Sequence, residues 1–350
     1  MAETQKRLYF ANDYGQGCHP RVLERLAETN LTPQPGYGGD DYCAAARGRL
    51  RDLCRCPEAE VFFLSGGTQT NRVVISALLR PWEGVLAAET GHVAVHEAGA
   101  IESAGHKVLP LPAHQGKLDA AETEAYLRSF YADGNHDHMV FPGMVYISWP
   151  TELGTLYTRA ELTALRALCD RWGIPLYLDG ARLGCGLASR DCDLSLPEIA
   201  ALCDVFYLGG TKQGALLGEA LIFPRSRVPD HFVTLVKQQG ALLAKGRAIG
   251  VQFEALLEDG LYFELGQNAV DRAEELKAVL RREGWRFYLE SPTNQQFLIV
   301  PDELLEPLGE RVAFSFWENY DETHSVIRLC TSWATTREDV EELGRVLKEI

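Results

Sequence analysis

The sequence lacks the features that mark several large classes of protein. It has no excess of basic residues, because 34 lysines and arginines stand against 49 aspartates and glutamates, giving a net charge of −15. Such a charge disfavours binding to nucleic acid or to an anionic membrane surface. No apolar run reaches the roughly 20 residues of a membrane-spanning helix, and the start lacks the long apolar core of a signal peptide. We therefore expect a cytoplasmic protein that binds neither nucleic acid nor membranes.

Signatures of metal sites and repeats are also missing. The sequence has nine cysteines, but its closest pair, Cys54 and Cys56, has no second pair at the spacing of zinc ligands. In the cytoplasm cysteines stay reduced, and we interpret these as small buried side chains without a metal. The sequence shows no internal repeat and no low-complexity tract. In so acidic a chain, an anionic ligand must be held by local cations and backbone amides.

What the sequence does contain is an alternation of short apolar runs and amphipathic segments. Runs such as Glu60–Leu64, Val85–Ala88 and Pro175–Leu178 are typical of buried strands, and helical patterns lie between them. The alternation predicts an α/β domain with a mostly parallel sheet, which we assign to residues 1–248. Residues 249–350 pair helices with several strand-like runs, which predicts a smaller α+β domain. A chain of 350 residues is long enough for both.

Polar or glycine-rich motifs follow several of the predicted strands. They are Ser65–Asn71, His92, Asp179–Arg182 and Lys212. Ligands bind at the carboxyl ends of strands in such sheets, so we expect these motifs to lie close together.

The Ser65–Asn71 motif reads Ser-Gly-Gly-Thr-Gln-Thr-Asn and connects a strand to a helix. Free amides and the positive end of the helix dipole then point to one spot, which predicts a cradle for a single phosphate at Gly67 and Thr68. It is neither the dinucleotide fingerprint nor the Walker sequence. The alternative is a tight turn with a helix cap.

Lys212 stands between the apolar run Asp204–Leu208 and a predicted returning strand, Glu219–Phe223. Glycines surround it, and a poorly solvated lysine more readily loses its proton and forms an imine with a carbonyl cofactor. The alternative is a lysine in an exposed hairpin loop. Asp179 could likewise be a helix cap or part of a buried salt bridge. A phosphate cradle, an acidic residue and a reactive lysine are together what pyridoxal 5'-phosphate (PLP) requires.

These motifs resemble those of the low-specificity L-threonine aldolases. These are fold-type I PLP enzymes of the β-eliminating lyase and threonine aldolase superfamily. The resemblance runs from Asp13 through Arg328 and is carried by Ser65–Asn71, His92–Gly99, Leu178–Leu183, Thr211 with Lys212, and Arg328–Ser332. It departs from the family pattern where Thr211 replaces the usual serine before the lysine, where Asn12 and Asp13 replace an N-terminal hydroxyl residue, and at Trp333.

The resemblance implies a role for each cofactor-binding residue. Gly67 and Thr68 would hold the PLP phosphate, and His92 would stack on the ring. Asp179 would pair with the ring nitrogen, and Lys212 would form the Schiff base.

The resemblance also implies which residues bind the substrate and which residue reaches a neighbouring subunit. Arg182 and Arg328 would grip the carboxylate of a small amino acid. Arg247 would reach the phosphate of a neighbouring subunit in a homo-oligomer, in which dimers that share active sites would form a tetramer. The sequence offers Lys245 and Arg247 around a glycine, in the middle of a helix expected over 232–257 and at the point where we expect that helix to break. The alternative is that both cations face solvent.

The implied reaction is retro-aldol cleavage of a β-hydroxy-α-amino acid to glycine and an aldehyde. We expect His92 to take the β-hydroxyl proton, with His96, His136, His138 or water as alternatives, in which case His92 only stacks. A related PLP lyase acting by β-elimination, an aminotransferase, or a PLP carrier without turnover would share the same cofactor-binding residues.

Overall fold

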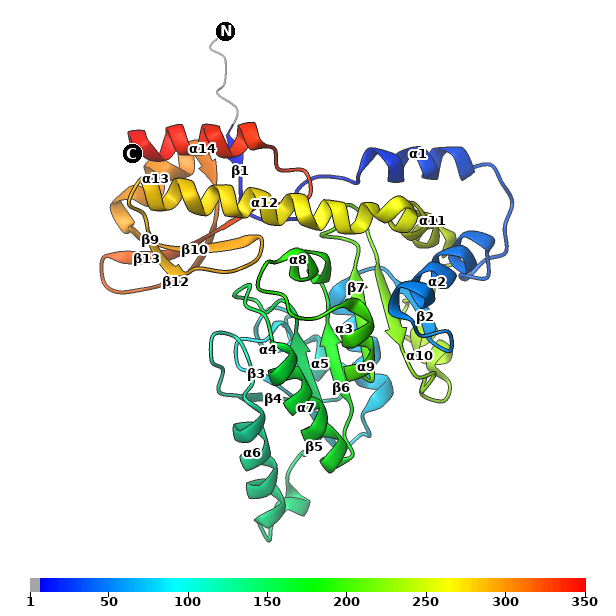
Figure 1. The fold of residues 1–350 in the computed structure, drawn as a ribbon. Helices are drawn as coiled ribbons and strands as arrows, with labels where there is room; N and C mark the ends of the chain where they lie inside the picture. Colours follow the sequence, from blue (N-terminus) through cyan, green and yellow to red (C-terminus); the bar gives the residue numbers. More distant parts are fainter. Residues whose placement is uncertain (1–6) are drawn as a thin grey trace.

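The computed structural model describes residues 7–350 and contains a large seven-stranded sheet and a smaller four-stranded one (Figure 1). The first residues, which bear on the expectation about a signal peptide, lie outside this range. The elements of the first part of the chain are β1 (Leu8–Tyr9), α1 (Pro20–Thr29), α2 (Asp41–Cys54), β2 (Glu60–Leu64), α3 (Gly67–Leu78), β3 (Glu83–Ala88), α4 (His92–Val95), α5 (Ala100–Ser103), β4 (Val108–Leu111), α6 (Ala120–Ala132), the 3-10 helix η1 (His136–His138), β5 (Phe141–Ser148) and α7 (Arg159–Trp172).

The second part completes the large sheet and forms the smaller one. Its elements are β6 (Leu176–Asp179), α8 (Leu183–Ala188), α9 (Leu196–Leu202), β7 (Val205–Gly209), β8 (Glu219–Phe223), α10 (Phe232–Gln238), α11 (Arg247–Leu257), η2 (Glu258–Gly260), α12 (Leu261–Arg282), β9 (Arg286–Leu289), β10 (Gln295–Pro301), α13 (Asp302–Arg311), β11 (Val312–Ala313), β12 (Ser315–Asn319), β13 (His324–Cys330) and α14 (Arg337–Glu349).

The large sheet has the strand order β2-β8-β7-β6-β5-β3-β4. Strand β8 runs antiparallel to both of its neighbours, and the remaining pairs are parallel. The expectation of a mostly parallel sheet is therefore confirmed. Because β2, β3, β5, β6 and β7 all run in one direction, their carboxyl ends lie along the same edge of the sheet.

Side chains of the central strands alternate between two cores. Leu176 and Leu178 of β6 belong to one hydrophobic cluster and Tyr177 to another, as the period of two in a strand requires. Helices α2, α7, α9 and α11 supply the first cluster, and α3 and α10 supply the second. Burial on both faces explains why these strands are apolar throughout.

The C-terminal sheet has the order β12-β13-β10-β9 and is antiparallel. Helices α12 and α14 pack in its core, and α12 spans the distance from α11 to this sheet (Figure 1). This confirms the expected α+β C-terminal part. Strands β1 and β11 form a separate two-stranded sheet, which places Leu8 and Tyr9 beside the C-terminal part of the chain. The domain boundary expected at residue 248 stays a prediction; α11 begins one residue before it.

The helix expected over 232–257 is broken, as expected, but the break is longer than Lys245–Arg247 and begins earlier. Helix α10 ends at Gln238, and α11 begins only at Arg247. Gly240 takes a left-handed conformation (φ 71°), and the amide of Ala241 bonds the carbonyl of Val236, a common way to end a helix. Lys245 therefore lies in a turn. Within residues 7–350, no helix has both the length and the apolar character needed to cross a membrane.

Candidate active site

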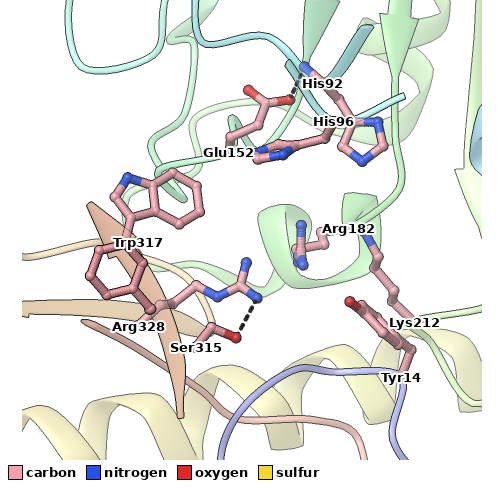
Figure 2. Close-up of a pocket in the computed structure, with 10 residues that line it drawn as sticks. Tyr14, His92, His96, Glu152, Arg182, Lys212, Ser315, Trp317 and Arg328 are labelled. Atoms are coloured by element: carbon pink, nitrogen blue, oxygen red, sulfur yellow. Dashed lines mark hydrogen bonds between the residues drawn. The ribbon is translucent and has the colours of Figure 1, made fainter. Parts of the chain in front are cut away.

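The motifs that follow the strands meet at two adjoining cavities. An outer cavity of about 420 Å³ reaches the C-terminal sheet, and an inner cavity of about 370 Å³ reaches the Ser65–Thr68 turn and Asp179. Figure 2 shows the side chains around the outer cavity. Six residues line both cavities and so mark their junction: Tyr14, His92, His96, Glu152, Arg182 and Lys212.

The turn after β2 leaves the start of α3 open to the inner cavity. Gly66 precedes the helix, and no side chain caps it. Within the described residues, no protein acceptor bonds the amides of Gly67 and Thr68. A Cβ atom at Gly66 would meet nothing within 4 Å, so there is space beside these amides. An uncapped helix start with free amides suits a phosphate group.

Asp179, the last residue of β6, is a buried hydrogen-bond acceptor with 4% exposure. One carboxylate oxygen accepts from Asn71 Nδ2 (3.0 Å) and the Tyr146 hydroxyl (2.6 Å). The other accepts from the Ala181 amide (3.0 Å) and the Tyr207 hydroxyl. Burial alone would raise the pKa of Asp179, but the nearby His92 and these bonds lower it on balance. The carboxylate is therefore ionised and rigidly held.

Lys212 lies in the loop of the β7–β8 hairpin and faces both cavities rather than solvent alone. Gly218 closes the loop with a φ of 118° and bonds the amide of Gly210 through its carbonyl. Burial lowers the pKa of Lys212, and the charge of Arg182 lowers it further. This favours the neutral amine that covalent chemistry needs.

Two side chains next to Lys212 stabilise the loop from within. The Thr211 hydroxyl donates to Glu219 Oε1 (2.8 Å) and accepts from the Gly218 amide (3.1 Å). Glu219 also accepts from the Gly210 amide (2.9 Å). Burial raises the pKa of Glu219 to about 7 in spite of these bonds. The hydroxyl of Thr211 therefore connects the two ends of the loop that carries Lys212.

Two buried acids hold His92, the first residue of α4. Its Nδ1 lies 2.8 Å from Glu97 Oε1, and its amide donates to Glu152 Oε1 (2.9 Å). Glu97 also accepts from Asn71 (2.6 Å), which links His92 to the partners of Asp179. Burial raises the pKa of Glu152, although a bond from Ser148 opposes the shift. His92 is thus fixed at the junction of the two cavities.

The two arginines predicted to bind substrate both line the outer cavity. Arg182 pairs with Asp13 through Nε (2.6 Å) and Nη2 (3.0 Å), which leaves Nη1 outside the pair. Burial alone would raise the pKa of Asp13, but Arg182 and Lys212 hold it well below its usual range. Arg328, on β13, donates to Gln295 (2.9 Å) and to the carbonyl of Ala11 (3.2 Å).

Three residues considered in the sequence lie elsewhere. His136 and His138 form η1 just before β5, at the opposite edge of the sheet, and line neither cavity. They are therefore no longer candidates for the base. Arg247 donates to the carbonyls of Thr29 and Thr32, at the end of α1, and its guanidinium lies 4.9 Å from the ring centre of Tyr42.

Sequence reasoning missed several residues of the site. Glu152 follows β5 by four positions, so the rule that led to the other strand ends could also have found it. Tyr14 lies with its ring 5.9 Å from Lys212 Nζ, and Trp317 comes from the C-terminal sheet. No local pattern marks these two. Within the described residues, no group of three or more His, Cys, Asp or Glu residues is arranged to hold a metal ion.

Known proteins match the chain over nearly its whole length. The family model of the β-eliminating lyases matches residues 17–302. A low specificity L-threonine aldolase of Pseudomonas aeruginosa is 32% identical over 349 residues, covering 99% of this chain and 98% of that protein. One of a Pseudomonas species is 30% identical over 351 residues, covering 99% of both.

Solved structures agree with this. A threonine aldolase of Leishmania major has a TM-score of 0.94 and 43% identity, covering 97% of this chain and 98% of that one. An aspartate aminotransferase of Thermus thermophilus has a TM-score of 0.70 at 17% identity, covering 98% and 91%. At that identity the second match shows the shared fold alone.

Proposed function

The chain belongs to the β-eliminating lyase family, in the group of the low-specificity L-threonine aldolases, and from this premise we propose its reaction. The enzyme cleaves L-threonine, L-allo-threonine and related β-hydroxy-α-amino acids to glycine and an aldehyde. The observation that carries the proposal is the meeting of Lys212, Asp179 and the uncapped start of α3 at one cavity. The match to threonine aldolases over both full lengths supports the choice of reaction.

The cofactor is PLP, and the inner cavity fits it in three respects. The free amides at Gly67 and Thr68 would hold the phosphate, and ionised Asp179 would keep the ring nitrogen protonated. The amine of Lys212 would bind the aldehyde, with His92 stacked on the ring. When bound, PLP supplies a conjugated ring that takes up the electrons released when a bond to Cα breaks.

The chain's own residues orient the substrate and move its proton. Arg328 and the free Nη1 of Arg182 grip the carboxylate, which fixes the direction of the Cα–Cβ bond. Glu97 binds His92 at Nδ1, so Nε2 is the atom that accepts the β-hydroxyl proton. His96 is the alternative, because burial lowers its pKa and keeps it neutral at neutral pH.

The active form is a homo-oligomer in the cytoplasm, at least a dimer, with Arg247 near a neighbour's phosphate site. The inner cavity supports this, because Arg182 and Lys212 are the cations that line it, and the first is paired with Asp13. A dianionic phosphate needs a further cation. The cytoplasm is supported by nine cysteines, all free.

Incubation with three kinds of substrate tests the reaction. Purified holoenzyme should release glycine and acetaldehyde from L-threonine or L-allo-threonine. Pyruvate from L-serine would instead indicate β-elimination, and transfer of an amino group to a keto acid would indicate an aminotransferase. Either of these without glycine release would refute the proposal.

A further inference from the structure

Three consecutive residues of β12 line the outer cavity: Ser315, Phe316 and Trp317. Neighbouring side chains of a regular strand point to opposite faces, so a regular β12 could not place all three there. Its pairing with β13 is irregular at this point. Phe316 pairs with Ile327 and Glu318 with Val326, which leaves Trp317 without a partner residue. One extra residue in a strand is a β-bulge, and bulges redirect side chains next to binding sites.

The indole of Trp317 packs among three neighbouring side chains. Its ring centre lies 4.9 Å from that of Phe297, a fully buried residue of β10, at 76°. The ring of His96, from the large domain, lies 6.0 Å away. The guanidinium of Arg328 lies 5.7 Å from the indole centre. Figure 2 shows the indole beside Arg328, on the side of the cavity away from Lys212. Trp317 is therefore a fixed aromatic wall between Arg328 and His96.

We infer that Trp317 determines which Cβ substituent the enzyme prefers, and that it favours an aryl group over the methyl group of threonine. This inference rests on the proposed function. With the carboxylate at Arg328 and the β-hydroxyl at His92 or His96, the remaining Cβ substituent lies against the indole. A methyl group covers little of that surface. A phenyl group covers more of it and makes an aromatic contact as well.

The carboxylate and hydroxyl contacts are common to all substrates of this class. They contribute equally to the turnover of threonine and of phenylserine, so they cannot discriminate between the two. Discrimination must come from the surface that only the variable substituent touches. Trp317, unlike Arg328 or His92, is in that position.

The test compares kcat/KM for L-threo-phenylserine and for L-threonine in the holoenzyme, with glycine release as the readout. Trp317→Ala should lower the ratio of phenylserine to threonine by on the order of tenfold, because an aromatic contact and its buried area are lost. Trp317→Phe should keep most of the ratio. Tyr320→Ala removes an exposed aromatic residue of the same hairpin that lies outside both cavities, and it should leave the ratio unchanged.

The ratio of the two kcat/KM values shows whether Trp317 sets the substrate preference or has only a structural role. If Trp317→Ala only loosens the fold or shifts Arg328, kcat/KM should fall by the same factor for both substrates. The ratio of phenylserine to threonine would then stay constant, and this result would overturn the inference. A ratio that rises would show that the indole excludes large groups, which overturns it as well. If the unaltered enzyme releases glycine from neither substrate, the proposed function itself fails.

Discussion

Replacing Asp179 with asparagine removes one charge from the most highly coordinated carboxylate of the site. Each of its oxygens accepts two hydrogen bonds. In the variant, an amide group takes the place of one oxygen, and two donors then lose their acceptor. Since a buried bond to a charged acceptor contributes about 1.5–3 kcal/mol, the loss of two should lower the free energy of unfolding by about 3–6 kcal/mol.

The substitution should also weaken the binding of the cofactor. Loss of one member of a buried charge pair typically costs about 3–5 kcal/mol, so affinity for PLP should fall on the order of 100-fold or more. Turnover at saturating PLP should also fall steeply, because an unprotonated ring is a poor electron sink. Urea unfolding measures the free energy of unfolding, absorbance titration measures the affinity for PLP, and glycine release measures turnover.

Asp204→Asn is the matched control. Asp204 precedes β7 at the opposite edge of the sheet and pairs with Arg166 and Arg225. Its loss should destabilise the fold but leave PLP affinity and turnover intact. If Asp179→Asn behaves like this control, our account of the ring nitrogen is wrong.

Three further predictions follow from the charges around the substrate. Arg328→Lys should raise KM and lower kcat, because lysine cannot make the planar two-point contact with a carboxylate. The control Arg286→Lys, on the same sheet, should change neither constant. If Arg328→Lys has the same kcat and KM as the unaltered enzyme, Arg328 does not bind the substrate carboxylate. Asp13→Asn should lower the free energy of unfolding at neutral pH by about 3–5 kcal/mol. The folded-state pKa of Asp13 lies below its ordinary 3.8, so its contribution is complete above that value and is lost as the pH falls below it; a gap between variant and unaltered protein that stays constant in acid would refute this. Mixed subunits of inactive Lys212→Ala and Arg247→Ala proteins should regain activity after exchange, whereas confirmed exchange without recovery would exclude shared sites.

The large sheet and the residues at its carboxyl edge could be predicted because their signals are local. An apolar run followed by glycines or by Asp179 indicates a buried strand and its end. The parallel direction of the strands then places these ends at one edge. The same reasoning would have reached Glu152.

Contacts made across the chain could not be predicted in this way. The pairing of Asp13 with Arg182 depends on how the N-terminal segment runs from its pairing with β11 into the site. Trp317 faces the cavity because of a bulge, which no pattern within β12 indicates. The break between α10 and α11 was expected at Lys245–Arg247, but its start was placed too late, because the apolar pattern continues through Gly240, whose left-handed conformation ends α10.

The most direct test of the account is the absorbance and turnover of Lys212→Ala. Lys212 is the lysine that lines both cavities, and burial lowers its pKa. The variant should lose the visible absorbance of the lysine-bound cofactor and nearly all glycine release. Lys237→Ala, which removes a lysine from α10 outside both cavities, should keep both. If Lys212→Ala retains the absorbance and the activity, Lys212 does not bind the cofactor and the central claim is wrong.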